Sequence, residues 1–116
     1  MRRSIKGGGL YLFKFFKKDR PEITVDELAQ KLPQVAVIDV RRSDEYHTDH
    51  IPGAIHIPLD VVASLDLPQE LTELKGQKIY IICRSGRRSA RAVQILRQVG
   101  YQADNVVGGM LAWNKK

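Results

Sequence analysis

The sequence predicts an α/β fold with a mainly parallel sheet, because strand-like and helix-like signals alternate from Glu22 onward. Two continuous apolar runs, residues 35–38 and 79–82, are typical of strands buried on both faces. A total of 116 residues suits one domain with a real hydrophobic core. We therefore expect a single domain over residues 21–116, preceded by an extension over residues 1–20.

The first half of this domain predicts a helix, a strand and a second helix. Thr24 and Glu27 have the spacing of a capping box, which opens a helix that Pro33 stops. The run 35–38 forms the strand, which ends at Asp39, and residues 43–49 form the next, polar helix.

The second half continues the alternation up to the end of the chain. The expected elements are a short strand at 54–57, one or two short helices within 59–74, a strand at 79–82, a helix at 89–99, a strand at 105–107 and a helical turn at 110–113. The helix at 89–99 has an inward apolar stripe and is stopped by Gly100. The stripe consists of Ala92, Val93, Leu96 and Val99. Gly108 and Gly109 form a turn, and Trp113 is a packing anchor.

The net charge of +6 belongs to the extension. Residues 1–20 carry seven Lys or Arg and one Asp, which leaves 19 − 7 = 12 basic and 13 − 1 = 12 acidic groups in residues 21–116. A balanced domain gives no electrostatic footprint for nucleic acid, so we expect no DNA or RNA binding by it.

The extension combines basic residues with a short apolar stretch at residues 10–16. This stretch is too short to span a bilayer, and lysines interrupt it without a following signal cleavage site. Two interpretations stay open. The extension makes a weak membrane-surface or partner contact, or it is a loosely attached leader whose aromatic side chains pack on the domain.

Cys83 is the one cysteine of the chain, so no internal disulfide can form. This fits a reducing compartment, and we expect a cytoplasmic protein with a free thiol. Cys83 directly follows the strand at 79–82, at the sheet edge where open parallel sheets bind ligands.

The segment from Cys83 to Ser89 is suited to a reactive thiolate. Loop N–H groups, the positive end of the following helix and nearby guanidinium groups lower a cysteine pKa from about 8.5 to roughly 3.5–7.5. Four arginines follow this thiol closely in the sequence, namely Arg84, Arg87, Arg88 and Arg91. An activated sulfur and an anionic substrate are both indicated.

The number of residues in the loop after the cysteine determines which anion the loop can bind. The protein tyrosine phosphatase pattern has five residues between cysteine and arginine, followed by Ser or Thr, but position 89 here is Ser89. Arg88 has four residues between itself and Cys83. The smaller ring suits one sulfur atom attached to the cysteine rather than a phosphate ester.

Three ordered segments resemble the signatures of single-domain rhodaneses, from about Glu22 to Trp113. They are the loop 83–88, the upstream residues 39–41, 45–46 and 50–58, and the final residues 100–101, 107–109 and 112–113. One departure is Asp49, where family members often have glycine, and it bears on a local turn. The resemblance implies a three-layer α/β/α domain with a central parallel five-stranded sheet and a persulfide mechanism at Cys83.

In that mechanism the Cys83 thiolate attacks the outer sulfur of thiosulfate, sulfite leaves, and cyanide or a thiol, including a protein thiol, later takes the sulfur. We expect substrate-binding positions at Arg84, Ser85, Gly86, Arg87, Arg88 and Ser89. Within this set, Arg84 and Arg87 attract the donor, while Arg88 either joins them or turns inward to brace the loop. Ser85 and Ser89 both offer hydroxyl groups to the site.

We expect the remaining polar residues to have structural rather than catalytic roles. Asp39, Arg41 and Glu45 are interpreted as a structural ion-pair set, and the three histidines lack metal-site spacing. No cofactor and no metal are expected. Two alternatives to sulfurtransferase activity stay open: a persulfide carrier or regulatory binding module with little turnover, and a related cysteine phosphatase or arsenate reductase.

Overall fold

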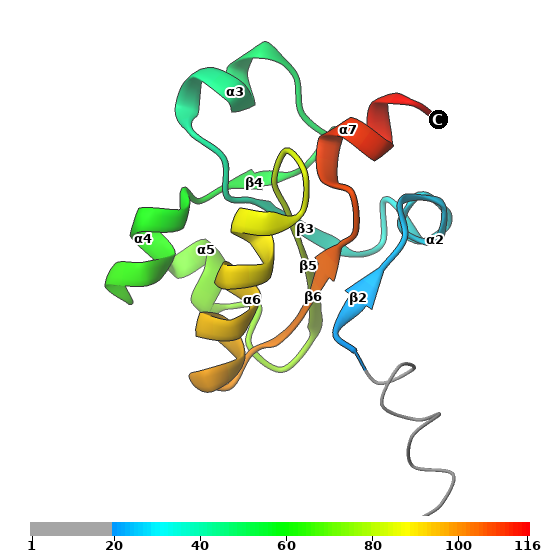
Figure 1. Ribbon diagram of the computed structural model, residues 1–116. Helices are drawn as coiled ribbons and strands as arrows, with labels where there is room; N and C mark the ends of the chain where they lie inside the picture. The colour runs from blue at the N-terminus through cyan, green and yellow to red at the C-terminus, as the bar shows by residue number, and fades with distance from the viewer. Residues whose placement is uncertain (1–19) are drawn as a thin grey trace, which may run out of the picture.

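A five-stranded parallel sheet in the order β2-β6-β5-β3-β4 forms the centre of the domain (Figure 1). The computed structural model describes residues 20–116. The strands are β2 (Glu22–Ile23), β3 (Ala36–Asp39), β4 (Ile55–His56), β5 (Lys78–Ile82) and β6 (Gln102–Val106). The expected parallel sheet of five strands is confirmed.

Helices cover both faces of this sheet, which confirms the three layers. They are α2 (Val25–Lys31), α3 (Ser43–Thr48), α4 (Leu59–Ser64), α5 (Gln69–Thr72), α6 (Arg87–Gln98) and α7 (Gly109–Asn114). One face carries α4, α5 and α6, and the other carries α2 and α7 (Figure 1).

Strand alternation divides the core into two clusters. On β5, Ile79 and Ile81 face the cluster under α4, α5 and α6, whereas Tyr80 and Ile82 face the one under α2 and α7. All three isoleucines are fully buried. Burial of such a side chain contributes about 1.5–3 kcal/mol, so β5 is held from both sides and fixes the point at which Cys83 leaves the sheet.

Local sequence signals position several helix ends as expected. The Thr24 hydroxyl accepts the Glu27 N–H at 3.1 Å, and the Glu27 carboxylate accepts the Thr24 N–H at 3.0 Å, so the capping box is confirmed. Helix α6 ends at the expected place, where Gly100 has a φ of +98°.

Three boundaries differ from the sequence expectation. Helix α6 begins at Arg87 rather than at residue 89, because Gly86 takes a φ of +102° and is itself the N-cap. Strand β6 starts at Gln102, three residues earlier than expected, since its polar residues hide the strand pattern. The two-residue β2 was not predicted and pairs with β6 at the edge of the sheet.

The prediction of a basic and apolar extension falls almost entirely on residues 1–19, which lie outside the described residues. None of the helices within residues 20–116 has the length and apolar character needed to cross a bilayer.

Candidate active site

Cys83 lies at the carboxyl end of β5, in the centre of the sheet. Residues 83–86 form a tight loop between this strand and the N-terminus of α6. On the neighbouring strand the last register pair is Asp39 with Ile82, so Val40 follows directly beside Cys83. The thiol is 1 % exposed, which places its sulfur at the floor of the loop rather than on the outer surface.

Two donors point at the Cys83 sulfur. The Gly86 backbone N–H lies 3.1 Å from Sγ, and the Ser89 hydroxyl lies 3.2 Å from it. Burial raises the pKa of Cys83, but the Ser89 hydroxyl and the backbone N–H groups of Ser89, Gly86 and Ser85 outweigh it, so the pKa lies below its ordinary value. The positive end of α6 acts in the same direction. The loop is therefore built to hold a sulfur anion.

Asn105 on β6 supports this loop from behind, and sequence reasoning did not select it. Its side-chain N–H donates to the Gly86 carbonyl at 3.1 Å, and its Oδ1 accepts the Ser89 hydroxyl at 2.5 Å. Ser89 has one hydroxyl proton, so Asn105 and Cys83 compete for it. A buried amide at the end of a core strand next to the cysteine strand is the signal that would have pointed to it.

The N-terminus of α7 fixes the two carbonyls that open the loop. Met110 N–H donates to the Cys83 carbonyl at 2.8 Å, and Leu111 N–H donates to the Arg84 carbonyl at 3.0 Å. Gly109 allows this approach, since a Cβ there would collide with both carbonyl oxygens. The predicted glycine turn thus also supports the loop.

Arg88 turns toward α3 and braces the loop. Its guanidinium donates two hydrogen bonds to the Glu45 carboxylate, at 2.7 and 2.9 Å. Glu45 also accepts the Arg42 backbone N–H at 3.1 Å. Arg88 is the main cause that holds the pKa of Glu45 at about 2, well below the usual 4.5. Of the two orientations expected for Arg88, the inward one is present.

The other expected ion pair lies beneath α3. The Arg41 guanidinium and the Asp39 carboxylate are 2.8 Å apart and both are buried, and Arg41 also donates to the Asp49 carbonyl at 2.6 Å. The interpretation of Asp39, Arg41 and Glu45 as a structural set is consistent with these contacts, with Glu45 paired to Arg88 instead of Arg41.

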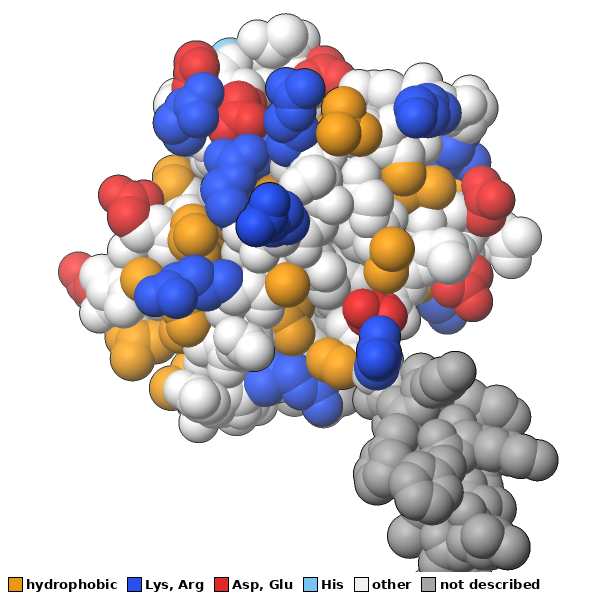
Figure 2. Space-filling view, in the orientation of Figure 1, with side chains coloured by type: hydrophobic (Ala, Val, Ile, Leu, Met, Phe, Trp, Pro, Cys, Tyr) orange, Lys and Arg blue, Asp and Glu red, His pale blue; other side chains and the backbone are white. Residues whose placement is uncertain are grey.

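The remaining loop residues face solvent. Arg84, Ser85 and Arg87 are exposed, and so is Arg91 one helical turn after Arg87. Figure 2 shows Lys and Arg side chains gathered on the face of the molecule that carries α6. The structure therefore places an arginine-rich surface around the mouth of the loop.

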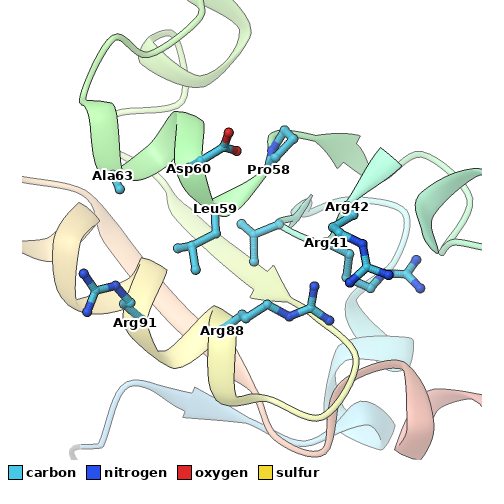
Figure 3. A pocket seen from close by; sticks show the side chains of 9 residues that line it. Arg41, Arg42, Pro58, Leu59, Asp60, Ala63, Arg88 and Arg91 are labelled. Carbon is cyan, nitrogen blue, oxygen red and sulfur yellow. The ribbon is translucent and has the colours of Figure 1, made fainter. Parts of the chain in front are cut away.

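A cavity of about 530 Å³ opens next to this surface, between α4 and α6 (Figure 3). Val40, Pro58, Leu59 and Ala63 form its apolar part. Its polar rim consists of Arg41, Arg42, Asp60, Arg88 and Arg91. Arg88 belongs both to this rim and to the first turn after the cysteine loop, so the cavity lies beside that loop, although Cys83 itself does not line it.

Comparison with known proteins decides the family. The model of the rhodanese-like domain matches residues 24–116 of this chain. The chain belongs to the rhodanese-like domain family.

Curated relatives of this rhodanese-like domain include two proteins of one bacterium. The chain is 41 % identical over 100 residues to the putative sulfur carrier protein YrkF of Bacillus subtilis, covering 83 % of this chain and 52 % of that protein. It is 36 % identical over 96 residues to the putative sulfurtransferase YtwF of the same organism, covering 79 % and 88 %. The chain thus spans about half of YrkF and most of YtwF.

Solved structures agree with this assignment. A rhodanese-like domain protein from Staphylococcus aureus matches with a TM-score of 0.70 and 40 % identity, over 79 % of this chain and 89 % of that one. The human single-domain sulfurtransferase TSTD1 matches with a TM-score of 0.72 and 28 % identity, over 83 % and 96 %.

The three histidines of this rhodanese-like domain all pack around one tyrosine. Tyr46 stacks between His50 and His56, with ring centroids 3.8 and 4.5 Å away, and His47 packs edge-on against the same tyrosine. Within residues 20–116 no three His, Cys, Asp or Glu side chains converge as metal ligands would. The chemistry available at the site is that of a hydrogen-bonded cysteine among arginines.

Proposed function

We propose that this rhodanese-like domain is a sulfurtransferase that moves sulfane sulfur from thiosulfate to a thiophilic acceptor through a Cys83 persulfide. One observation carries the proposal: the buried Cys83 sulfur accepts hydrogen bonds from the Gly86 N–H and the Ser89 hydroxyl at the N-terminus of α6. This arrangement stabilises a sulfur anion both before and after the first transfer.

In the first half-reaction the Cys83 thiolate attacks the outer sulfur of thiosulfate. A new S–S bond forms, the bond to the sulfonate sulfur breaks, and sulfite leaves with that electron pair. Sulfite needs no proton to depart, so the loop requires no general acid. The exposed Arg84 and Arg87 attract the thiosulfate dianion, and Ser85 lies between them at the mouth. The Glu45 contacts of Arg88 favour a bracing role over a substrate contact.

In the second half-reaction a nucleophile such as cyanide or a thiolate attacks the outer sulfur of the persulfide. The S–S bond breaks and its electrons return to Sγ, which restores the Cys83 thiolate. Two half-reactions that share one enzyme intermediate give ping-pong kinetics.

A persulfide carrier with low turnover is the second candidate. The relative YrkF is named a putative sulfur carrier protein, and other relatives combine adenylyltransferase and sulfurtransferase in one name. Slow turnover with thiosulfate together with fast sulfur exchange to a protein thiol would favour this role.

A phosphatase or arsenate reductase is disfavoured by the loop. Arg88 follows Cys83 after four residues and is held by Glu45, so the ring is small and its arginine is occupied. Hydrolysis of an aryl phosphate that disappears in Cys83→Ser would bring this candidate back.

The deciding experiment combines turnover with intact mass. Thiosulfate and cyanide should yield thiocyanate, and thiosulfate alone should add one sulfur atom, about 32 Da, to the protein. Both results should vanish in Cys83→Ser, while Gln30→Ala, at an exposed position of α2, retains both. Absence of turnover and of any Cys83-dependent mass gain would contradict the proposal.

The single cysteine supports a reducing, cytoplasmic location as part of this proposal. Residues 1–20 supply the positive charge for a weak contact with an anionic membrane surface.

A further inference from the structure

Three exposed arginines near the loop have no acidic partner in the part of the chain that the structure describes. The ion pairs among residues 20–116 involve Arg41, Arg42, Arg88 and Arg97, but not Arg84, Arg87 or Arg91. Arg87 and Arg91 stand four apart on α6, where like charges repel each other. A ligand with several negative charges would relieve this repulsion.

The three arginines extend over a longer distance than a thiosulfate ion can span. Arg91 lies about 6 Å farther along the helix axis than Arg87, at 1.5 Å per residue. Its guanidinium points away from Arg88, toward the end of the cavity near Ala63 (Figure 3). An anion bound over Cys83 by Arg84 and Arg87 leaves Arg91 unused.

The cavity between α4 and α6 runs from this arginine to Arg88 and Val40, the lining residues nearest the Cys83 loop. Val40 in its wall follows the strand position next to Ile82 and belongs to the same core cluster as Cys83. Pro58, Leu59 and Ala63 give it an apolar surface that a small inorganic anion does not need. A volume of about 530 Å³ is within the range of sites that enclose organic groups.

We propose that this face binds an extended acidic segment of a protein acceptor, which carries the accepting thiol at its end. The thiol reaches the Cys83 persulfide, an apolar side chain enters the cavity, and carboxylates meet Arg87 and Arg91. An extended chain advances about 3.3 Å per residue, so a few residues span the path from the loop to Arg91. Asp60 lies on the α4 side of the rim, and its negative charge repels the carboxylates of the segment toward the arginines of α6.

This inference rests on the proposed function, because it names the acceptor of the same persulfide. The acceptor thiolate attacks the outer sulfur, the S–S bond to Sγ breaks, and the segment leaves as a persulfide while Cys83 returns to the thiolate. No oxidant or reductant is consumed.

Two short synthetic peptides test the acceptor class. Both end in leucine, glycine and cysteine, and one carries glutamates where its twin carries glutamines. The full chain is loaded with sulfur by thiosulfate, and loss of the added mass is followed with each peptide and with 2-mercaptoethanol. The acidic peptide should react about three- to fivefold faster than its twin at low salt, and the difference should shrink at high salt.

Two variants locate the binding face. Arg91→Gln should remove most of the advantage of the acidic peptide, and Ala63→Phe should slow both peptides by filling the cavity. Neither variant should change the rate with 2-mercaptoethanol. Lys31→Gln on α2 removes the same charge outside the cavity and should behave like the unmodified protein.

The outcomes separate this inference from the proposed function. Failure of thiosulfate to load Cys83 contradicts the proposed function, and inorganic polysulfide then serves as the loading agent for the peptide assay. Equal rates for the two peptides, or an Arg91→Gln effect that extends to 2-mercaptoethanol, overturn the acidic acceptor. A small thiol acceptor would then be the correct assignment.

Discussion

The Ser89 hydroxyl has two possible acceptors for its one proton. It lies 3.2 Å from the Cys83 sulfur and 2.5 Å from Asn105 Oδ1, and it can serve one of them at a time. A thiolate draws the proton toward sulfur, whereas a neutral thiol leaves it with Asn105. The hydroxyl therefore follows the charge on Cys83 through the reaction.

Ser89→Ala should raise the pKa of Cys83, because the hydroxyl donates to the thiolate and lowers that pKa. Thiolate chemistry is lost as pH falls through the pKa, so the loss should begin at higher pH in the variant. Loss of one such hydrogen bond corresponds to about fivefold in alkylation rate on the acidic side. The pH profile of iodoacetamide alkylation measures it, and an unchanged profile would remove Ser89 from the site.

Asn105→Asp should raise the same pKa through Ser89. A carboxylate keeps the Ser89 proton, adds negative charge beside the thiolate and no longer donates to the Gly86 carbonyl. The rise in the pKa of Cys83 should be smaller in a Ser89→Ala background, because the competition for the Ser89 proton is then absent. Equal effects in both backgrounds would show that Asn105 does not act through Ser89.

At the scale of elements, the pair between α3 and α6 decides how firmly the loop is held. Glu45 and Arg88 are far apart in the sequence, and their two hydrogen bonds join the segment after β3 to the first turn after the loop. A shift of α3 would therefore be transmitted to the cysteine loop.

Glu45→Gln should destabilise the fold at neutral pH by about 1–2 kcal/mol, a range reduced for the partial exposure of Arg88. The folded-state pKa of Glu45 is depressed from 4.5 to about 2, so its contribution is present above 4.5 and lost as pH falls toward 2. The variant should lose less stability than the unmodified protein over this interval. Urea unfolding at several pH values gives the comparison, and parallel curves would contradict the assignment.

Sequence reasoning succeeded where the physical cause is local. The capping box of α2 and the apolar run of β5 are each determined by neighbouring residues. It failed where the partner is remote. Nothing near Asn105 indicates that its amide meets Gly86, and nothing near Met110 indicates that its N–H meets the Cys83 carbonyl.

At the scale of the whole molecule, charge is divided between two regions. Residues 21–116 carry equal numbers of acidic and basic groups, and the excess of +6 lies in residues 1–20. Any attraction to an anionic membrane surface should therefore come from the extension, whereas the proposed binding of thiosulfate rests on the loop arginines.

Removal of residues 1–19 should leave thiocyanate formation unchanged, because Cys83 and the groups that hydrogen-bond to its sulfur lie within residues 20–116. Binding to vesicles with anionic lipid should fall by at least about tenfold, since each basic residue near such a surface contributes about 1 kcal/mol. Neutral vesicles serve as the control. Unchanged vesicle binding would favour the interpretation of a leader without a membrane role.

The hydrogen bonds from α7 to the cysteine loop have a consequence for biosynthesis. A ribosome makes Cys83 before it makes Met110 and Leu111, whose N–H groups fix the loop carbonyls. The strand β6 that carries Asn105 is also made later. A nascent chain therefore contains the thiol before the groups that hold the loop exist, and the two loop carbonyls gain these hydrogen bonds only after α7 docks.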